Sequence, residues 1–157
     1  MRLRVYLAGG LFNAGERLHN LRLEQALKTL GREVILPQRE ALRFFNGTIF
    51  DIPKIVEDCR LAAADPANIL VANVDGGDAD SGTAVEYGIA ITATGRAIVY
   101  RTDFRTAPDR ELGLNAMFRA EKTSFIYKPC FFTELAQVDD YYRELAQEID
   151  EDIRRIE

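Results

Sequence analysis

The chain has 157 residues, of which 47% are hydrophobic and 29% are charged, and its net charge is −5. This length suits one compact domain over residues 1–157, and the composition excludes disordered and fibrous proteins. Because 25 acidic residues outnumber 20 scattered basic residues, we expect no nucleic-acid-binding surface.

The first half of the chain predicts two strand-helix units. Helical spacing of apolar residues and a closing glycine indicate the first helix, and Pro37 closes the second strand. The N-terminal apolar run ends at Gly9, too soon for a signal peptide or a membrane span, so we predict a cytoplasmic protein with no membrane partner. The predicted elements are a strand over 3–10, a helix over 13–31, a strand over 32–37 and, after a loop, a helix over 52–64.

The second half continues the alternation. The nearly continuous apolar run over 68–74 is typical of a strand that is buried on both faces. The further predicted elements are a helix over 81–95, strands over 97–101 and 124–127, and a closing helix over 131–157. Strands that alternate with helices predict an α/β fold: a single-domain, doubly wound, flavodoxin-like sheet of five parallel strands with helices on both faces.

Such sheets bind ligands beyond the carboxyl ends of their strands, where residues 9–13, 37–39 and 75–86 are expected. The stretch 10–17 has the glycine spacing of a phosphate-binding loop, but Glu16 and Arg17 replace its Lys and its Ser or Thr. The dinucleotide fingerprint G-x-G-x-x-G is absent. Gly9 and Gly10 therefore either form a tight turn or let a ligand approach the backbone.

Acidic residues crowd the start of the helix that follows the third strand. One interpretation is a capping box over 83–86, in which Thr83 caps the helix and Glu86 reaches back to its end. A calcium loop fails where Gly82 and Thr83 replace the third ligand and the required glycine. Alternatively, Asp80 and Glu86 lie in the ligand crevice, where one carboxylate attacks and the other handles protons, and Gly82 leaves room for a substrate.

Four segments resemble, in register, the nucleoside 2-deoxyribosyltransferases: 5–13, 36–38, 68–90 and 114–117. The resemblance extends over residues 5–117, and its most specific part is the D-x-G-x-x-x-E spacing of Asp80, Gly82 and Glu86. It implies a double displacement on 2′-deoxynucleosides and free nucleobases, without metal or cofactor. A carboxylate attacks C1′, the base leaves, and a second base is then attached to the deoxyribosyl-enzyme.

By position, the resemblance implies that Glu86 is the nucleophile and that Tyr6 holds its carboxylate, although Tyr6 also suits a core aromatic. Asp80 matches the aspartate that serves the departing base or a sugar hydroxyl. Asn115 and Met117 match residues lent by a neighbouring subunit, which implies a homo-oligomer, either a dimer-based tetramer or a hexamer. The expected substrate-binding residues are Gly9, Phe12, Gln38, Asn68, Gly82, Asn115 and Met117. Gln38 also suits a solvated loop amide, and Phe12 a packing role.

Glycosyl transfer chemistry agrees with this assignment. Its oxocarbenium-like transition state is stabilised by a carboxylate beneath C1′, and retention of configuration follows. The leaving base needs a proton from an acid with a raised pKa, a demand that two neighbouring carboxylates such as Asp80 and Glu86 can meet.

Some residues depart from the family pattern or serve no role in it. The family carries an aspartate at the start of the third strand, where strand register places Asn68 unless an insertion has moved the acid to Asp65. The tail from residue 141 indicates a charged amphipathic helix for packing or subunit contact instead of a segment near the site. His19 is expected to have no catalytic role, and Cys59 and Cys130 are expected to be small buried hydrophobic residues.

Two other functions remain open. A deoxynucleoside monophosphate N-glycosidase shares the carboxylate arrangement and uses water as the acceptor, but it needs donors for the 5′-phosphate. A phosphorylatable receiver module would place Asp75, Thr102 and Lys128 after three strands. The receiver's acidic pair after the first strand is missing, since Ala8, Gly9 and Gly10 stand there.

Overall fold

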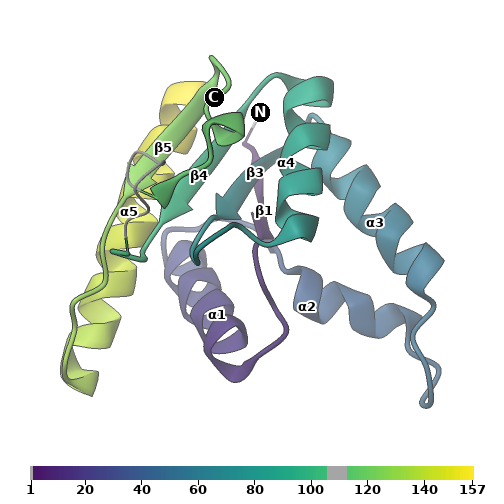
Figure 1. The fold of residues 1–157 in the computed structure, drawn as a ribbon, viewed down its shortest axis with the longest axis horizontal. Helices are drawn as coiled ribbons and strands as arrows, with labels where there is room; N and C mark the ends of the chain where they lie inside the picture. Colours follow the sequence, from purple (N-terminus) through teal and green to yellow (C-terminus); the bar gives the residue numbers. More distant parts are fainter. Residues whose placement is uncertain (1, 106–112) are drawn as a thin grey trace.

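The computed structural model describes residues 2–105 and 113–157. In this part of the chain, five parallel strands form one sheet in the order β2-β1-β3-β4-β5 (Figure 1). This strand order is that of flavodoxin-like doubly wound folds, so the predicted α/β fold class is confirmed. The strands are β1 (Arg4–Ala8), β2 (Val34–Ile35), β3 (Asn68–Asn73), β4 (Ala97–Arg101) and β5 (Thr123–Tyr127).

Helices cover both faces of the sheet. On one face, α1 (Ala14–Thr29) and α5 (Val138–Ile156) bury apolar side chains together with Val5 and Leu7 of β1 (Figure 1). On the other face, α3 (Ile52–Ala64) and α4 (Ser81–Thr94) pack against Tyr6 and Ala8 of the same strand. Successive strand side chains point to opposite faces, so Tyr6 is directed toward the α3 and α4 layer.

Two element boundaries differ from the prediction. The second strand pairs through Val34 and Ile35 only, because Pro37 opens the short helix α2 (Pro37–Glu40), followed by η1 (Ala41–Phe44), where a loop was expected. The closing helix begins at Val138 instead of residue 131, after the turn η4 (Leu135–Gln137). Among the described residues, no helix is both long and apolar enough to cross a membrane.

The start of α4 decides between the two interpretations of Glu86. Asp80 is the N-cap of this helix, and its side chain accepts hydrogen bonds from the Thr83 backbone N–H at 2.9 Å and the Thr83 hydroxyl at 3.1 Å. The capping box over 83–86 is therefore wrong, because the helix already begins at Ser81. Glu86 lies in the second turn, where it is not needed to satisfy the helix end.

Candidate active site

Most of the predicted site residues lie around one cavity at the carboxyl ends of β1 and β2. Its volume is about 490 Å³, within the usual range for small-molecule sites. The segment from residue 37 to 55 supplies apolar side chains to its wall, and the start of α4 supplies two carboxylates. Of the predicted residues, the lining includes Gly9, Phe12, Gln38, Asp80, Gly82 and Glu86.

Tyr6 and Glu86, which the family resemblance pairs, are in direct contact in the structure. The Tyr6 hydroxyl donates a hydrogen bond of 2.8 Å to Oε1 of Glu86, which joins β1 to α4 across 80 residues of sequence. Tyr6 is almost completely buried, whereas Glu86 is half-buried and borders the cavity. One oxygen of the Glu86 carboxylate is therefore held by Tyr6, while the side chain borders the cavity.

The protonation of Glu86 is balanced near neutral pH. The pKa of Glu86 is raised to about 7: burial is the main cause and the Asp80 charge adds to it, whereas hydrogen bonds from Tyr6 and Cys59 lower the pKa and partly offset the rise. Burial and the neighbouring Glu86 charge raise the pKa of Tyr6 far above its usual range, so Tyr6 remains a hydrogen-bond donor. Near pH 7, Glu86 is therefore ionised in a substantial fraction of molecules.

This raised pKa makes a stability prediction. The folded protein holds the Glu86 proton more tightly than the unfolded chain does. This proton therefore contributes fully to the unfolding free energy below pH ~4.5, and its contribution is lost as the pH rises through about 7. Glu86→Gln stays neutral and keeps an acceptor for Tyr6. We expect it to exceed the wild type by about 3 kcal/mol in unfolding free energy near pH ~8.5, and to match it near pH ~4. Urea titrations at both pH values check this, and equal stabilities at the higher pH would contradict it.

Asp80 borders two cavities. Besides the site cavity, it lines a larger hollow of about 790 Å³. The walls of this second hollow carry further carboxylates, from Glu16, Asp75, Asp78 and Asp103. Asp80 thus stands beside the Glu86 cavity on one side and an acidic hollow on the other.

Gln38 is fixed in the cavity wall and is not a solvated loop amide. It is only 7% exposed, its Oε1 accepts a 3.0 Å hydrogen bond from Asn20, and its Nε2 donates at 3.2 Å to the carbonyl of Arg17. Asn20 also donates to the Gly10 carbonyl, which ties the loop after β1 to the same group. Within the described part of the chain, the second Nε2 hydrogen of Gln38 has no protein acceptor and suits a ligand.

Phe12, Gly9 and Gly82 contribute shape to the site. Phe12 lies at the rim of the cavity and is 78% exposed, so the packing role is not supported. A Cβ atom at Gly9 would lie 3.1 Å from the Cβ atom of Asn73, so a glycine allows the loop after β1 to approach β3. A Cβ atom at Gly82 would come equally close to Oδ2 of Asp80.

Asn68 does not belong to the site, and its prediction as a substrate-binding residue is wrong. It pairs with Arg4 at the amino end of the sheet, four residues or about 13 Å before Ala72 along β3. Its side chain accepts a 2.9 Å hydrogen bond from Arg4 and donates to the Ala62 carbonyl. Asp65, the alternative, pairs with the same arginine at 2.8 Å. Parallel strands place their amino ends opposite the ligand crevice, so neither residue reaches it.

Asn115 and Met117 lie outside the Glu86 cavity of their own protomer. Asn115 caps the turn η3 (Ala116–Phe118) and Met117 lies within it. Both line a separate hollow with Ser81, Ala84 and Gly88 of α4. Met117 is 81% exposed. Their contribution to the site of a neighbouring subunit stays a prediction.

Cys59 is a site residue that the sequence prediction missed. It is half-buried and lines the cavity, and its thiol interacts with both Tyr6 and Glu86. Burial raises the pKa of Cys59, so it is a neutral thiol at pH 7. The available signal was its helical spacing from Ile52 and Ile55, which line the same cavity.

His19 and Asp75 have structural partners. The two ring nitrogens of His19 lie 2.8 and 2.9 Å from the hydroxyls of Tyr100 and Tyr142, and burial lowers its pKa so that it stays neutral. Both carboxylate oxygens of Asp75 accept hydrogen bonds from the loop after β4. The aspartate required by the receiver interpretation is therefore engaged within the protein.

Comparison with known proteins gives one family and one fold. A family model described as nucleoside 2-deoxyribosyltransferase matches residues 5–117. A conserved protein from Enterococcus faecalis V583 is 22% identical, with 100% of both chains covered and a TM-score of 0.62. A 2-deoxyribosyltransferase from Bacillus psychrosaccharolyticus is 21% identical over 91% of this chain and 95% of that chain, with a TM-score of 0.56. No curated protein sequence matches. At these identities, the two structures show a shared fold.

Proposed function

Because this chain belongs to the nucleoside 2-deoxyribosyltransferase family, whose members transfer deoxyribosyl groups between bases, we propose that it does so by double displacement through Glu86. The observation that carries this proposal is the position of the Glu86 carboxylate. It borders a cavity of suitable size while Tyr6 holds one of its oxygens at 2.8 Å. A carboxylate fixed in this way is a suitable nucleophile for an anomeric carbon.

In the first displacement, an ionised Glu86 oxygen forms a bond to C1′ as the bond from C1′ to the base nitrogen breaks. The negative carboxylate stabilises the positive charge that develops on the sugar. The electron pair of the broken bond leaves with the base, which must gain a proton. Asp80, beside Glu86 at the start of α4, is proposed to supply that proton.

In the second displacement, a free base attacks C1′ of the deoxyribosyl-Glu86 ester from the side the first base left. The ester bond breaks, Glu86 regains its carboxylate, and Asp80 takes the proton that the incoming base loses. Two inversions at C1′ give overall retention of configuration.

The cavity wall suits a 2′-deoxynucleoside. Apolar side chains of Leu42, Phe50 and Ile55 offer a surface for a planar base, and the Nε2 hydrogen of Gln38 offers a donor to its edge. We also propose a cytoplasmic homo-oligomer in which a neighbouring subunit lends Asn115 and Met117.

The charges of the cavity support the monophosphate hydrolase hypothesis less than the transferase proposal. Among the described residues that line it, Arg17 is the one basic side chain, and it donates a hydrogen bond to the carbonyl of Leu11. Asp80 and Glu86 oppose it with two carboxylates. This balance favours a substrate with a free 5′-hydroxyl over one with a 5′-phosphate.

Base exchange is the test of this proposal. Incubated with deoxyinosine and adenine, the protein is expected to form deoxyadenosine and hypoxanthine, which chromatography separates. Parallel reactions with pyrimidine donors and with deoxyinosine monophosphate define the substrate class. Release of free deoxyribose without a new nucleoside, or reaction of monophosphates alone, would overturn the transferase assignment in favour of the hydrolase.

A further inference from the structure

We propose that Arg101 is a positioning residue for the transfer reaction, because its buried guanidinium group ties the loop that carries Asp80 to the loop that follows β4. The inference rests on the proposed function. The first loop runs from Val74 to Asp80 between β3 and α4, and the second begins at Thr102. Arg101 itself is the last residue of β4 and does not line the Glu86 cavity.

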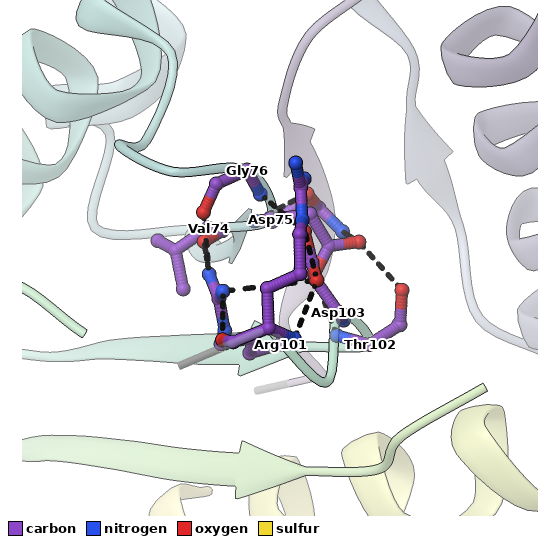
Figure 2. A network of polar contacts seen from close by, with 8 residues as sticks. Val74, Asp75, Gly76, Arg101, Thr102 and Asp103 are labelled. Atoms are coloured by element: carbon purple, nitrogen blue, oxygen red, sulfur yellow. Dashed lines mark hydrogen bonds and ion pairs between the residues drawn. The ribbon is translucent and has the colours of Figure 1, made fainter. Parts of the chain in front are cut away.

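Figure 2 shows how the Arg101 side chain reaches both loops. One terminal nitrogen donates to the carbonyls of Val74 at 2.8 Å and Gly76 at 3.0 Å, and the other donates to the Arg105 carbonyl at 3.0 Å. Arg101 is 1% exposed and is the largest fully buried side chain of the described residues. A planar, forked guanidinium can bind three carbonyls that point from different directions, whereas a lysine ammonium is a single point.

The position of Arg101 is not that of an ordinary ion pair. Among the described residues, the carboxylate nearest to its terminal nitrogens is that of Asp103, at 3.9 Å, and none of them provides a hydrogen-bond partner for the Nε atom of Arg101. A buried charge that is held mainly by carbonyls is costly for folding. The arrangement is therefore better explained by what it holds in place than by its contribution to stability.

Asp75 fastens the same two loops a second time (Figure 2). Its Oδ1 accepts hydrogen bonds from the backbone N–H groups of Thr102 at 2.6 Å and Asp103 at 2.9 Å, and its Oδ2 accepts one from the Thr102 hydroxyl at 2.5 Å. The Gly76 N–H donates in return to Asp103 at 3.1 Å. The first three residues of the Asp80 loop are thus fixed from both sides.

Arg101 also lies so close to Gly113 that a side chain at position 113 would collide with it. A Cβ atom at Gly113 would lie 2.7 Å from a terminal nitrogen of Arg101, and its φ of 71° is in the left-handed region. Gly113 directly precedes Leu114 and Asn115. The guanidinium therefore contacts the segment that leads into the proposed intersubunit residues as well as the Asp80 loop.

Loosening this anchor changes the environment of Glu86. Among the described residues, four titratable or charged groups contact Glu86 or line its cavity: Tyr6 from β1, Cys59 from α3, Arg17 from α1 and Asp80 at the start of α4. The Asp80 charge raises the pKa of Glu86. If the loop shifts Asp80 away, proton transfer to the base slows, and the acidic limb of the rate profile moves to lower pH.

The test compares Arg101→Lys with Arg32→Lys. Arg32 is also a buried arginine, 3% exposed, but it pairs with Asp150 at 2.5 Å and Glu157 at 2.7 Å, outside the cavity. Thermal unfolding, kcat, KM and the pH profile of base exchange are measured for both. We expect Arg101→Lys to lower kcat about 10- to 100-fold and to change KM less than about 3-fold. The acidic limb of its pH profile should move to lower pH. Arg32→Lys should lose stability while keeping the wild-type kcat and pH profile.

A second variant keeps the test decisive. If Arg101→Lys does not fold, Asp75→Asn removes the other anchor of the same loop, and the same fall in kcat and shift of the acidic limb are expected. Wild-type kcat and an unshifted profile in the folded variant overturn the inference, as does an equal change in Arg32→Lys. Failure of the wild type to exchange bases would refute the proposed function instead, so the two failures are distinct.

Discussion

Glu86→Gln is expected to lower kcat for base exchange by about 10³-fold or more, because the amide cannot form the bond to C1′. Gln has the shape of Glu and can still accept the hydrogen bond from Tyr6, so binding of the nucleoside should persist. The same variant is expected to be more stable than the wild type at alkaline pH. Higher stability combined with lost activity is the pattern of a site that is strained for function.

Glu57→Gln is the matched control for this substitution. Glu57 lies on the exposed side of α3, where it pairs with Arg60 at 2.7 Å, and it does not line the cavity. We expect it to retain wild-type exchange. Mass spectrometry of the intact wild type, mixed with donor alone, should detect a deoxyribosyl adduct that Glu86→Gln does not form. An adduct on the Glu86→Gln variant, or undiminished exchange by it, would rule out Glu86 as the nucleophile.

Asp80→Asn is expected to lower kcat by about 10²- to 10⁴-fold, because an amide cannot deliver a proton to the leaving base. Asn and Asp are about equally good N-caps, so α4 should stay intact and the unfolding free energy should change by less than about 0.5 kcal/mol. Removal of the Asp80 charge also lowers the pKa of Glu86. The acidic limb of the pH profile should therefore move to lower pH.

The control for Asp80→Asn is the same substitution at the N-cap of another helix. Asp51 caps α3 by accepting a hydrogen bond from the Lys54 N–H at 3.2 Å, and it does not line the cavity. Asp51→Asn should leave kcat and the pH profile unchanged. If both variants keep wild-type rates, Asp80 serves as a helix cap and the proton must come from another group.

The test on Arg101 extends these predictions beyond the cavity wall. Asp80→Asn removes the proposed proton donor, whereas Arg101→Lys leaves it in place on a loosened loop. Both substitutions are expected to move the acidic limb of the pH profile to lower pH, but the loss of kcat should be smaller for Arg101→Lys. This order separates the chemistry of Asp80 from its positioning.

Local patterns in the sequence determined the elements of the fold. Strands buried on both faces are nearly continuous apolar runs, helices show apolar residues at a 3.6-residue period, and Gly95 ends α4 with a φ of 72°. These signals arise between residues close in the chain, so they survive without tertiary information. They failed at residues 37–44, where a loop was expected and two short helical turns formed.

The sequence also determined which carboxylates to consider, through the spacing of Asp80, Gly82 and Glu86 and the family resemblance over residues 5–117. By itself it left Glu86 with two possible roles, because a capping box is a local pattern as well. The alternative was removed by the start of α4 at Ser81, with Asp80 as its cap.

Only the tertiary structure decided which of these residues meet. Tyr6 and Glu86 are 80 residues apart. They come together because α4 packs on the face of the sheet to which Tyr6 of β1 points. Strand pairing carried Asn68 to the amino end of the sheet beside Arg4, and helix packing turned Cys59 toward the cavity. The carbonyl partners of Arg101 come from two loops that only the sheet order brings together. The physical reason is that such contacts depend on side-chain packing between distant segments, which no short-range period in the sequence encodes.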